Sequence, residues 1–256
     1  MQATATRPAA VDDDPRAWLG PSPLIDLEDP KLRLRVRALT QLCKSDREKA
    51  LALYAFVKRI PLARRFKVRP STAREVYEAG RGDAPDKATL LVAMLRMAGL
   101  PARIRYVRLR GEILRGITSR PPLAGRALVE VWLQDRWIRT DTYIYDAACM
   151  AAARQSLKDL GWEWGYGIHV NGAMIWDGFD HAFVGGAPTE SDPMVIGEVG
   201  VFHDPSGYLS SRSFGRFSAR LARLVHSNIL APVIDRAWRR LRQENGPGDA
   251  RRRNST

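Results

Sequence analysis

The side chains that most often perform nucleophilic or metal chemistry are scarce in this 256-residue chain, which has two cysteines and four histidines. The histidines are His169, His181, His203 and His226. His169 and His181 lie twelve residues apart, and no pair has the i,i+4 or short-loop spacing of a recognisable zinc site. Neither Cys43 nor Cys149 opens an expected helix beside an obvious base. We therefore expect no metal site, no cofactor and two thiols that act as small buried hydrophobes.

Three helices are predicted in the first hundred residues. A capping box at Ser45 opens a helix that continues to about Arg59, and a second capping box at Thr72 opens a short helix that stops at Gly80. Asp83 can cap a third helix, with Pro85 and Asp86 in its first turn and Gly99 at its end. Its apolar positions fall on one face at helical spacing: Ala84, Ala88, Leu91, Leu95 and Ala98.

The pattern then changes to a period of two residues. Residues 102–109 alternate as a half-buried strand, and residues 128–133 and 136–139 form a predicted hairpin around a polar turn. Helices followed by antiparallel strands predict an α+β fold, in which a helical layer packs on an antiparallel sheet.

Two phrases in these elements resemble the core of the transglutaminase-like superfamily, whose fold is papain-like. The first runs from Gly82 to Arg103, and the second is RALVEVWL from Arg126, followed by WIRTD ending at Asp141. In the superfamily, Gly-x-Cys opens a helix that closes with Gly-Ile-Pro-Ala-Arg. His-Ala-Trp-x-Glu-Val follows on one strand, and Trp and Asp on the next. The resemblance covers roughly residues 29–145 and implies this α+β fold.

The family's chemistry is thiol acyl transfer by a Cys, a His and an Asp. The resemblance places Ala84 at the nucleophile, Arg126 at the histidine and Asp141 at the aspartate, so only the last survives. Alanine has no nucleophile, and a guanidinium cannot act as a base near pH 7. We expect Arg126 and Asp141 to form an ion pair across the old cleft; the alternative is that both are ordinary sheet residues.

Other residues of the cleft follow from the same resemblance. Asp83, Asp86, Lys87, Trp137 and Tyr143 are expected near it. Charged and phenolic groups in a cleft can serve general acid–base chemistry. The same groups can equally be helix caps and strand-face charges.

An aromatic and glycine-rich stretch follows the core strands. It alternates the two residue types, and its candidate binding residues are Trp162, Trp164, Tyr166 and His169. Such a stretch can wall a pocket for a flat or apolar ligand, or form a packed edge of the sheet.

Positive charge gathers at the C-terminal end. The whole chain has 41 Lys and Arg against 28 Asp and Glu, and eleven arginines lie after residue 210. We expect a flexible segment over residues 1–27, a transglutaminase-like domain over 28–210, a basic amphipathic helical extension over 211–243 and a disordered tail over 244–256. In the extension Arg212, Arg216, Arg220 and Arg223 oppose Phe214, Phe217, Leu221 and Leu224. This helix either docks on the core or meets an anionic surface; no specific nucleic-acid motif accompanies it.

Three function classes remain open. The first is a non-catalytic relative without a thiol triad that binds a small molecule or a protein in the cleft. The second is a repurposed enzyme that uses non-thiol acid–base chemistry there. The third is a cysteine-type acyltransferase or peptidase with relocated residues. The sequence has no transmembrane run and no signal-peptide pattern, so we expect a basic, soluble, cytoplasmic protein.

Overall fold

The computed structural model describes residues 14–64, 67, 69–118, 124–210, 232 and 235–243. The first half of the described chain is helical, with a 3-10 turn η1 (Pro15–Trp18) and helices α1 (Pro30–Thr40), α2 (Asp46–Arg59), α3 (Ala73–Ala79) and α4 (Ala84–Met97). The main strands are β1 (Ala102–Leu109), β2 (Ala124–Leu133), β3 (Arg136–Thr140) and β6 (Val195–Phe202). The other elements are η2 (Gly111–Leu114), α5 (Ala147–Asp159), β4 (Trp164–Gly165), β5 (Ile168–His169) and α6 (Pro205–Ser210).

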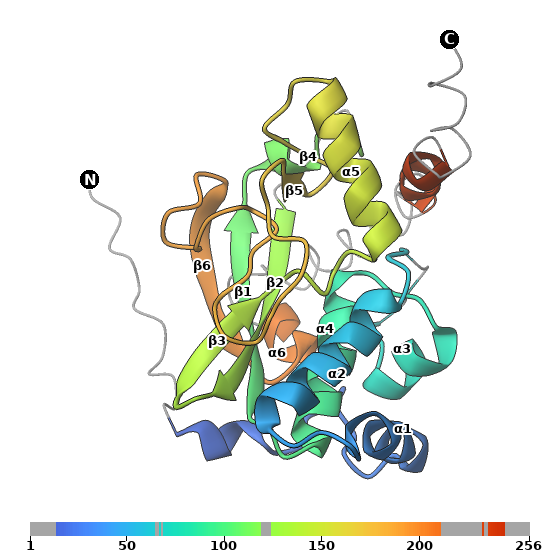
Figure 1. Cartoon of the computed structure of the whole chain (residues 1–256), viewed down its shortest axis with the longest axis vertical. Helices are drawn as coiled ribbons and strands as arrows, with labels where there is room; N and C mark the ends of the chain where they lie inside the picture. The colour runs from blue at the N-terminus through green and yellow to red at the C-terminus, as the bar shows by residue number, and fades with distance from the viewer. Residues whose placement is uncertain are drawn as a thin grey trace.

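The four long strands form one antiparallel sheet in the order β3-β2-β1-β6. Helices α1 to α4 gather on one side of it, and the small β4-β5 hairpin lies beside α5 at the other end of the molecule (Figure 1). This is the predicted α+β layout, with a helical layer on an antiparallel sheet.

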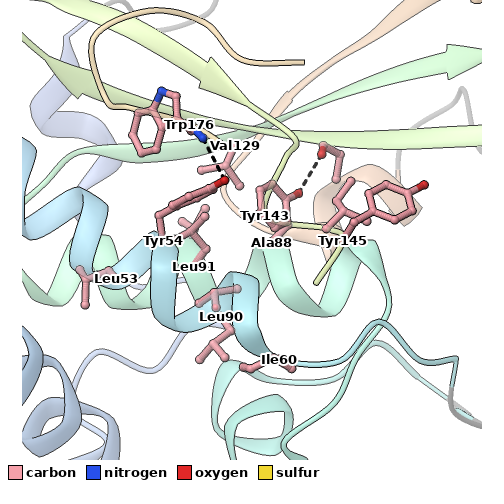
Figure 2. Close-up of a cluster of buried hydrophobic side chains, with 14 of the residues drawn as sticks. Leu53, Tyr54, Ile60, Ala88, Leu90, Leu91, Val129, Tyr143, Tyr145 and Trp176 are labelled. Atoms are coloured by element: carbon pink, nitrogen blue, oxygen red, sulfur yellow. Dashed lines mark hydrogen bonds between the residues drawn. The ribbon is translucent and has the colours of Figure 1, made fainter. Parts of the chain in front are cut away.

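Helix α4 runs through the centre of the core. It packs against α2, α3 and strands β1 and β2, and all its residues from 86 to 96 are buried. Its start is fixed as predicted, because the carboxylates of Asp83 and Asp86 form a reciprocal capping box and Pro85 occupies the first turn. Figure 2 shows part of this core, where Leu90 and Leu91 of α4 lie near Tyr54 of α2 and Val129 of β2.

The other predicted elements are confirmed closely. Helices α2 and α3 begin after Ser45 and Thr72, and α3 ends at Gly80 with a φ of 59°. Strand β1 spans the predicted residues. The hairpin turn at Gln134 and Asp135 has φ values of 53° and 56°, which is the left-handed geometry of a tight hairpin turn. Helix α5 and strand β6 were not predicted.

Among the described residues, no helix combines the length and the apolar character that crossing a bilayer requires. The predicted basic helix is described only at its end, where residues 235–243 are helical. Its expected positions Arg212, Phe214, Arg216, Phe217, Arg220, Leu221, Arg223 and Leu224 lie outside the described residues. Trp238 and Leu241 are buried against the core. Arg242 is half-buried rather than turned outward, because it pairs with Asp146 at 2.6 Å.

Candidate functional site

Ala84 is the first residue of α4, as predicted. Arg126 lies on β2, and Asp141 directly follows the last residue of β3, the strand paired with β2. The predicted ion pair is confirmed: Arg126 Nη1 lies 3.3 Å from Asp141 Oδ2, and both side chains are buried. The three positions that the resemblance assigns to the old triad are therefore an alanine and a buried ion pair.

The contacts of this ion pair fix two later segments of the chain. Arg126 Nη2 donates to the carbonyl of Gly167 at 2.8 Å, and the Val184 N–H donates to Asp141 Oδ1 at 2.8 Å. Burial raises the pKa of the Asp141 carboxyl above its usual value, and the positive charge of Arg126 opposes this rise. Asp141 Oδ2 has no hydrogen-bond donor among the described residues, so the charge of Arg126 is its main compensation.

The acidic candidates at the start of α4 act as caps. Asp83 Oδ1 accepts from the Asp86 N–H at 3.2 Å, and Asp86 Oδ2 accepts from the Asp83 N–H at 3.4 Å. Lys67 Nζ lies 2.9 Å from Asp83 Oδ2 and 2.6 Å from Asp86 Oδ2. Both carboxylates are thus held by the helix terminus and one lysine.

Lys87 is fully buried and its ammonium group is hydrogen-bonded to the backbone. It donates to the carbonyls of Ile60 at 2.8 Å, Ile144 at 2.9 Å and Lys58 at 3.4 Å. Desolvation lowers the pKa of Lys87 to about 7, and that of the neighbouring Lys58 to about 8. Lys87 therefore joins the end of α2 to the segment after β3.

The aromatic candidates of the cleft are also structural. Tyr143 is fully buried, lies beside Ala88 of α4 and donates its hydroxyl to the Ala127 carbonyl at 2.8 Å (Figure 2). Trp137 on β3 stacks against the guanidinium of Arg103, whose carbon lies 3.8 Å from the ring centroid.

The aromatic stretch after α5 forms one wall of a cavity. Trp162 and Trp164 line a cavity of about 700 Å³ together with the segment from Glu112 to Thr118. The carbon of the Arg115 guanidinium lies 3.5 Å from the centroid of the Trp162 ring. Tyr166 stacks on Trp162 with 6.4 Å between ring centroids. Of the four candidate residues in this stretch, Trp162 and Trp164 line the cavity, whereas Tyr166 and His169 do not.

His169 stands next to this wall without lining the cavity. Its ring lies 5.0 Å from that of Trp164, and its Nδ1 accepts from the Asn171 N–H at 3.0 Å. The Nδ1 of His181 accepts from the Arg139 N–H at 3.0 Å. No group of three or more His, Cys, Asp or Glu in the described part of the chain is arranged to hold a metal ion.

The family comparison agrees with this architecture. Residues 34–142 match the family model of the transglutaminase-like superfamily. This segment therefore has the fold of a transglutaminase-like core. Among solved structures, the chain is similar to one described as "a Putative Cysteine Protease from Cytophaga hutchinsonii", with 18% identity and a TM-score of 0.41; the match covers 50% of this chain and 42% of that one. The chain thus matches less than half the length of that protein. No curated protein matches the sequence.

Cys149 lies in the first turn of α5, a helix that was not predicted, and its N–H donates to Asp146 Oδ1 at 3.0 Å. The thiol is fully buried, and desolvation raises its pKa to about 12 although Lys58 and Lys87 lie nearby. Its helix position therefore does not produce a reactive thiolate.

Sequence reasoning missed Arg115, which covers one face of Trp162. It also missed Met194, which lines the same cavity from the segment before β6. No local signal connects these residues to the aromatic stretch, because they approach it only through the folded chain.

Proposed function

We propose that this chain is a non-catalytic relative of the thiol acyl-transfer enzymes and acts by binding a ligand or partner. The observation that carries the proposal is the buried ion pair of Arg126 and Asp141, at the positions of the family's histidine and aspartate. A guanidinium holds its proton at physiological pH and has no acceptor atom. Ala84 offers no nucleophile at the start of α4. These positions therefore supply neither the base that would accept a proton nor the nucleophile that would give one up.

The two catalytic alternatives have less support. A relocated thiol would need a thiolate at physiological pH, but burial raises the pKa of Cys149 to about 12. Non-thiol acid–base chemistry would need an accessible group, but Lys87 is fully buried and bonded to carbonyls. Asp83 and Asp86 are occupied as a capping box.

Turnover assays test the proposal directly. We expect the unmodified protein to show no transamidation of glutamine peptides and no peptide hydrolysis above the rate of a heat-denatured sample. Ala84→Cys alone should also be inactive, because Arg126 supplies no base, and losing one of two groups that act together costs nearly as much as losing both. Ala84→Cys combined with Arg126→His is the variant that restores both groups.

Alkylation of thiols with iodoacetamide is the control that distinguishes the two catalytic alternatives. Turnover by the unmodified protein that iodoacetamide abolishes would overturn the proposal and implicate Cys43 or Cys149. Turnover that resists iodoacetamide but is lost in Asp141→Asn would favour the non-thiol alternative instead.

A further inference from the structure

The terminal helix, formed by residues 235–243, is docked beside the loop that joins α2 to α3. Its Arg242 Nη2 donates to the Leu62 carbonyl in that loop at 2.8 Å. The centroid of the Trp238 ring lies 5.6 Å from that of Tyr145, which is close to the start of α5. Figure 1 shows this helix in red, next to α5. The last described part of the chain is thus fixed on the core.

The same loop is joined to the residues that precede α4. The Ala63 N–H donates to the Gly82 carbonyl at 3.0 Å, and Leu62 forms a β-bridge with Gly82. Arg81 directly precedes Gly82, and Arg59 is the last residue of α2. Three segments that are far apart in the sequence therefore meet in one region: the end of α2, the residues before α4, and the terminal helix.

We call this region the arginine surface, because each of its three segments carries exposed arginine. The members are Arg59, Arg81, Arg236 and Arg240, and their side chains form no ion pair, hydrogen bond or ring contact among the described residues. Arg236 and Arg240 lie about one turn apart on the exposed side of the terminal helix, opposite buried Trp238. The carboxylates on or beside these segments are already paired with other cations: Asp83 and Asp86 with Lys67, Asp146 with Arg242, and Asp235 with Arg239. The four arginines therefore give this surface positive charge that no described carboxylate compensates.

The arginine surface offers charge without apolar contact. The terminal helix buries its two large apolar side chains, Trp238 and Leu241, against the core. The large apolar side chains that are exposed in the described residues all lie on other segments. A helix that binds a membrane inserts an apolar face, and a protein interface has an apolar and aromatic centre. Both kinds of partner therefore fit this surface poorly, whereas interfaces with nucleic acids are polar and strongly positive.

We propose that the arginine surface binds the phosphate backbone of double-stranded nucleic acid, without reading its sequence. A guanidinium matches the oxygens of a phosphate with two parallel hydrogen bonds, and such contacts carry no sequence information. A single strand fits less well, because proteins hold its bases by stacking on aromatic rings. The described residues of the three segments expose no aromatic ring. The inference rests on the proposed binding function and adds a partner class at a surface of its own.

Fluorescence anisotropy of a labelled DNA duplex, titrated with the full chain at several salt concentrations, tests the proposal. The double variant Arg81→Gln/Arg240→Gln removes one charge from each of two segments. Each phosphate contact contributes about 0.9 to the slope of log K against log salt for duplex DNA. We therefore expect this slope to become shallower by about 1.8, and binding at about 0.1 M salt to weaken at least ten-fold. Single-stranded DNA, phosphatidylserine vesicles and poly-glutamate are titrated in parallel, and each should bind more weakly than the duplex.

The control variant separates this surface from the charge of the whole chain. Arg16→Gln/Arg108→Gln also removes two charges, from exposed arginines of η1 and β1 that are unpaired among the described residues, and should leave the slope nearly unchanged. All four side chains are exposed, so the urea midpoints of both variants should match that of the parent. No binding of the duplex, equal losses in the two double variants, or tighter binding of the single strand, the vesicles or poly-glutamate overturns the proposal. These results leave the inactive core unaffected, whereas thiol-dependent turnover would overturn the proposed function.

Discussion

Replacing Arg126 with methionine tests the structural role assigned to the ion pair. The substitution keeps a long apolar stem but removes the charge that lies 3.3 Å from Asp141 and the hydrogen bond to the Gly167 carbonyl. Arg126 is 8% exposed and Asp141 is 0% exposed at the side chain. Leaving one buried charge without its partner typically costs about 3–5 kcal/mol. That is a large part of the roughly 5–15 kcal/mol that stabilises a domain.

The loss of stability caused by Arg126→Met should depend on pH, because it depends on the charge of Asp141. Burial raises the pKa of Asp141, and loss of Arg126 should raise it further. Between the unfolded pKa near about 4 and the folded pKa, the folded state binds more protons than the unfolded state. The free energy of unfolding therefore falls as pH rises through this window. The deficit of Arg126→Met should be smaller at pH about 4.5 than at pH 7, because a protonated Asp141 needs no counter-charge.

Urea unfolding followed by circular dichroism at both pH values measures these quantities. Arg33→Met is the matched control, because Arg33 pairs with Glu28 at 2.6 Å but the side chains are 48% and 76% exposed. It should cost about 0–1 kcal/mol. Asp141→Asn added to Arg126→Met should recover part of the loss, since a neutral amide carries no unpaired charge. If Arg126→Met costs no more than Arg33→Met, or Asp141→Asn recovers nothing, the ion pair does not stabilise the fold as argued.

Three further predictions follow from buried groups. Iodoacetamide should label half-buried Cys43 in the native protein but Cys149 only after unfolding, because Cys149 is fully buried with a pKa of about 12; mass spectrometry of digests decides this. The free energy of unfolding should rise from pH about 7 to about 10. In this range the unfolded Lys87 still holds a proton, which the folded residue, with a pKa of about 7, has released. The urea midpoint of Lys87→Met should therefore rise less steeply with pH than that of the parent protein. Trp238→Ala should cost about 3–5 kcal/mol in urea unfolding, because its buried ring packs against Tyr145. An unchanged urea midpoint would show that the end of the basic extension is not docked.

Local signals were sufficient for helices α2, α3 and α4 of the helical layer and for the first three strands of the sheet. The side chains of Ser45, Thr72 and Asp83 each accept from a backbone N–H of the first turn. The residue types that predicted these three helix starts are therefore the ones that form the caps. Residues 102–109 form the central strand β1 between β2 and β6, but the expected half-buried alternation is not observed, because six of the eight residues are buried. These elements depend on neighbours close in the chain or on simple burial.

The missed elements depend on distant contacts. Strand β6 contains two glycines and pairs with β1 across about ninety residues, with shifts in register beside Tyr106 and Arg108. Helix α5 does have a local signal, since Asp146 caps an alanine-rich run. Its cap also accepts from the Leu62 N–H and from Arg242, which no local pattern indicates. The cavity needs η2 and β4 side by side, and only the folded chain provides this.

The arginine at the family's histidine position also explains how the aromatic stretch is held. The Arg126 Nη1 lies 3.3 Å from Asp141 Oδ2, and its Nη2 donates to the Gly167 carbonyl. A histidine side chain at the same position is too short to make both contacts at once. The N–H of the same Gly167 donates to Ile113, next to the cavity wall. One side chain thus neutralises a buried carboxylate and orders the segment that lines the cavity. The shape of the cavity is therefore expected to depend on the ion pair, although neither of its residues lines that space.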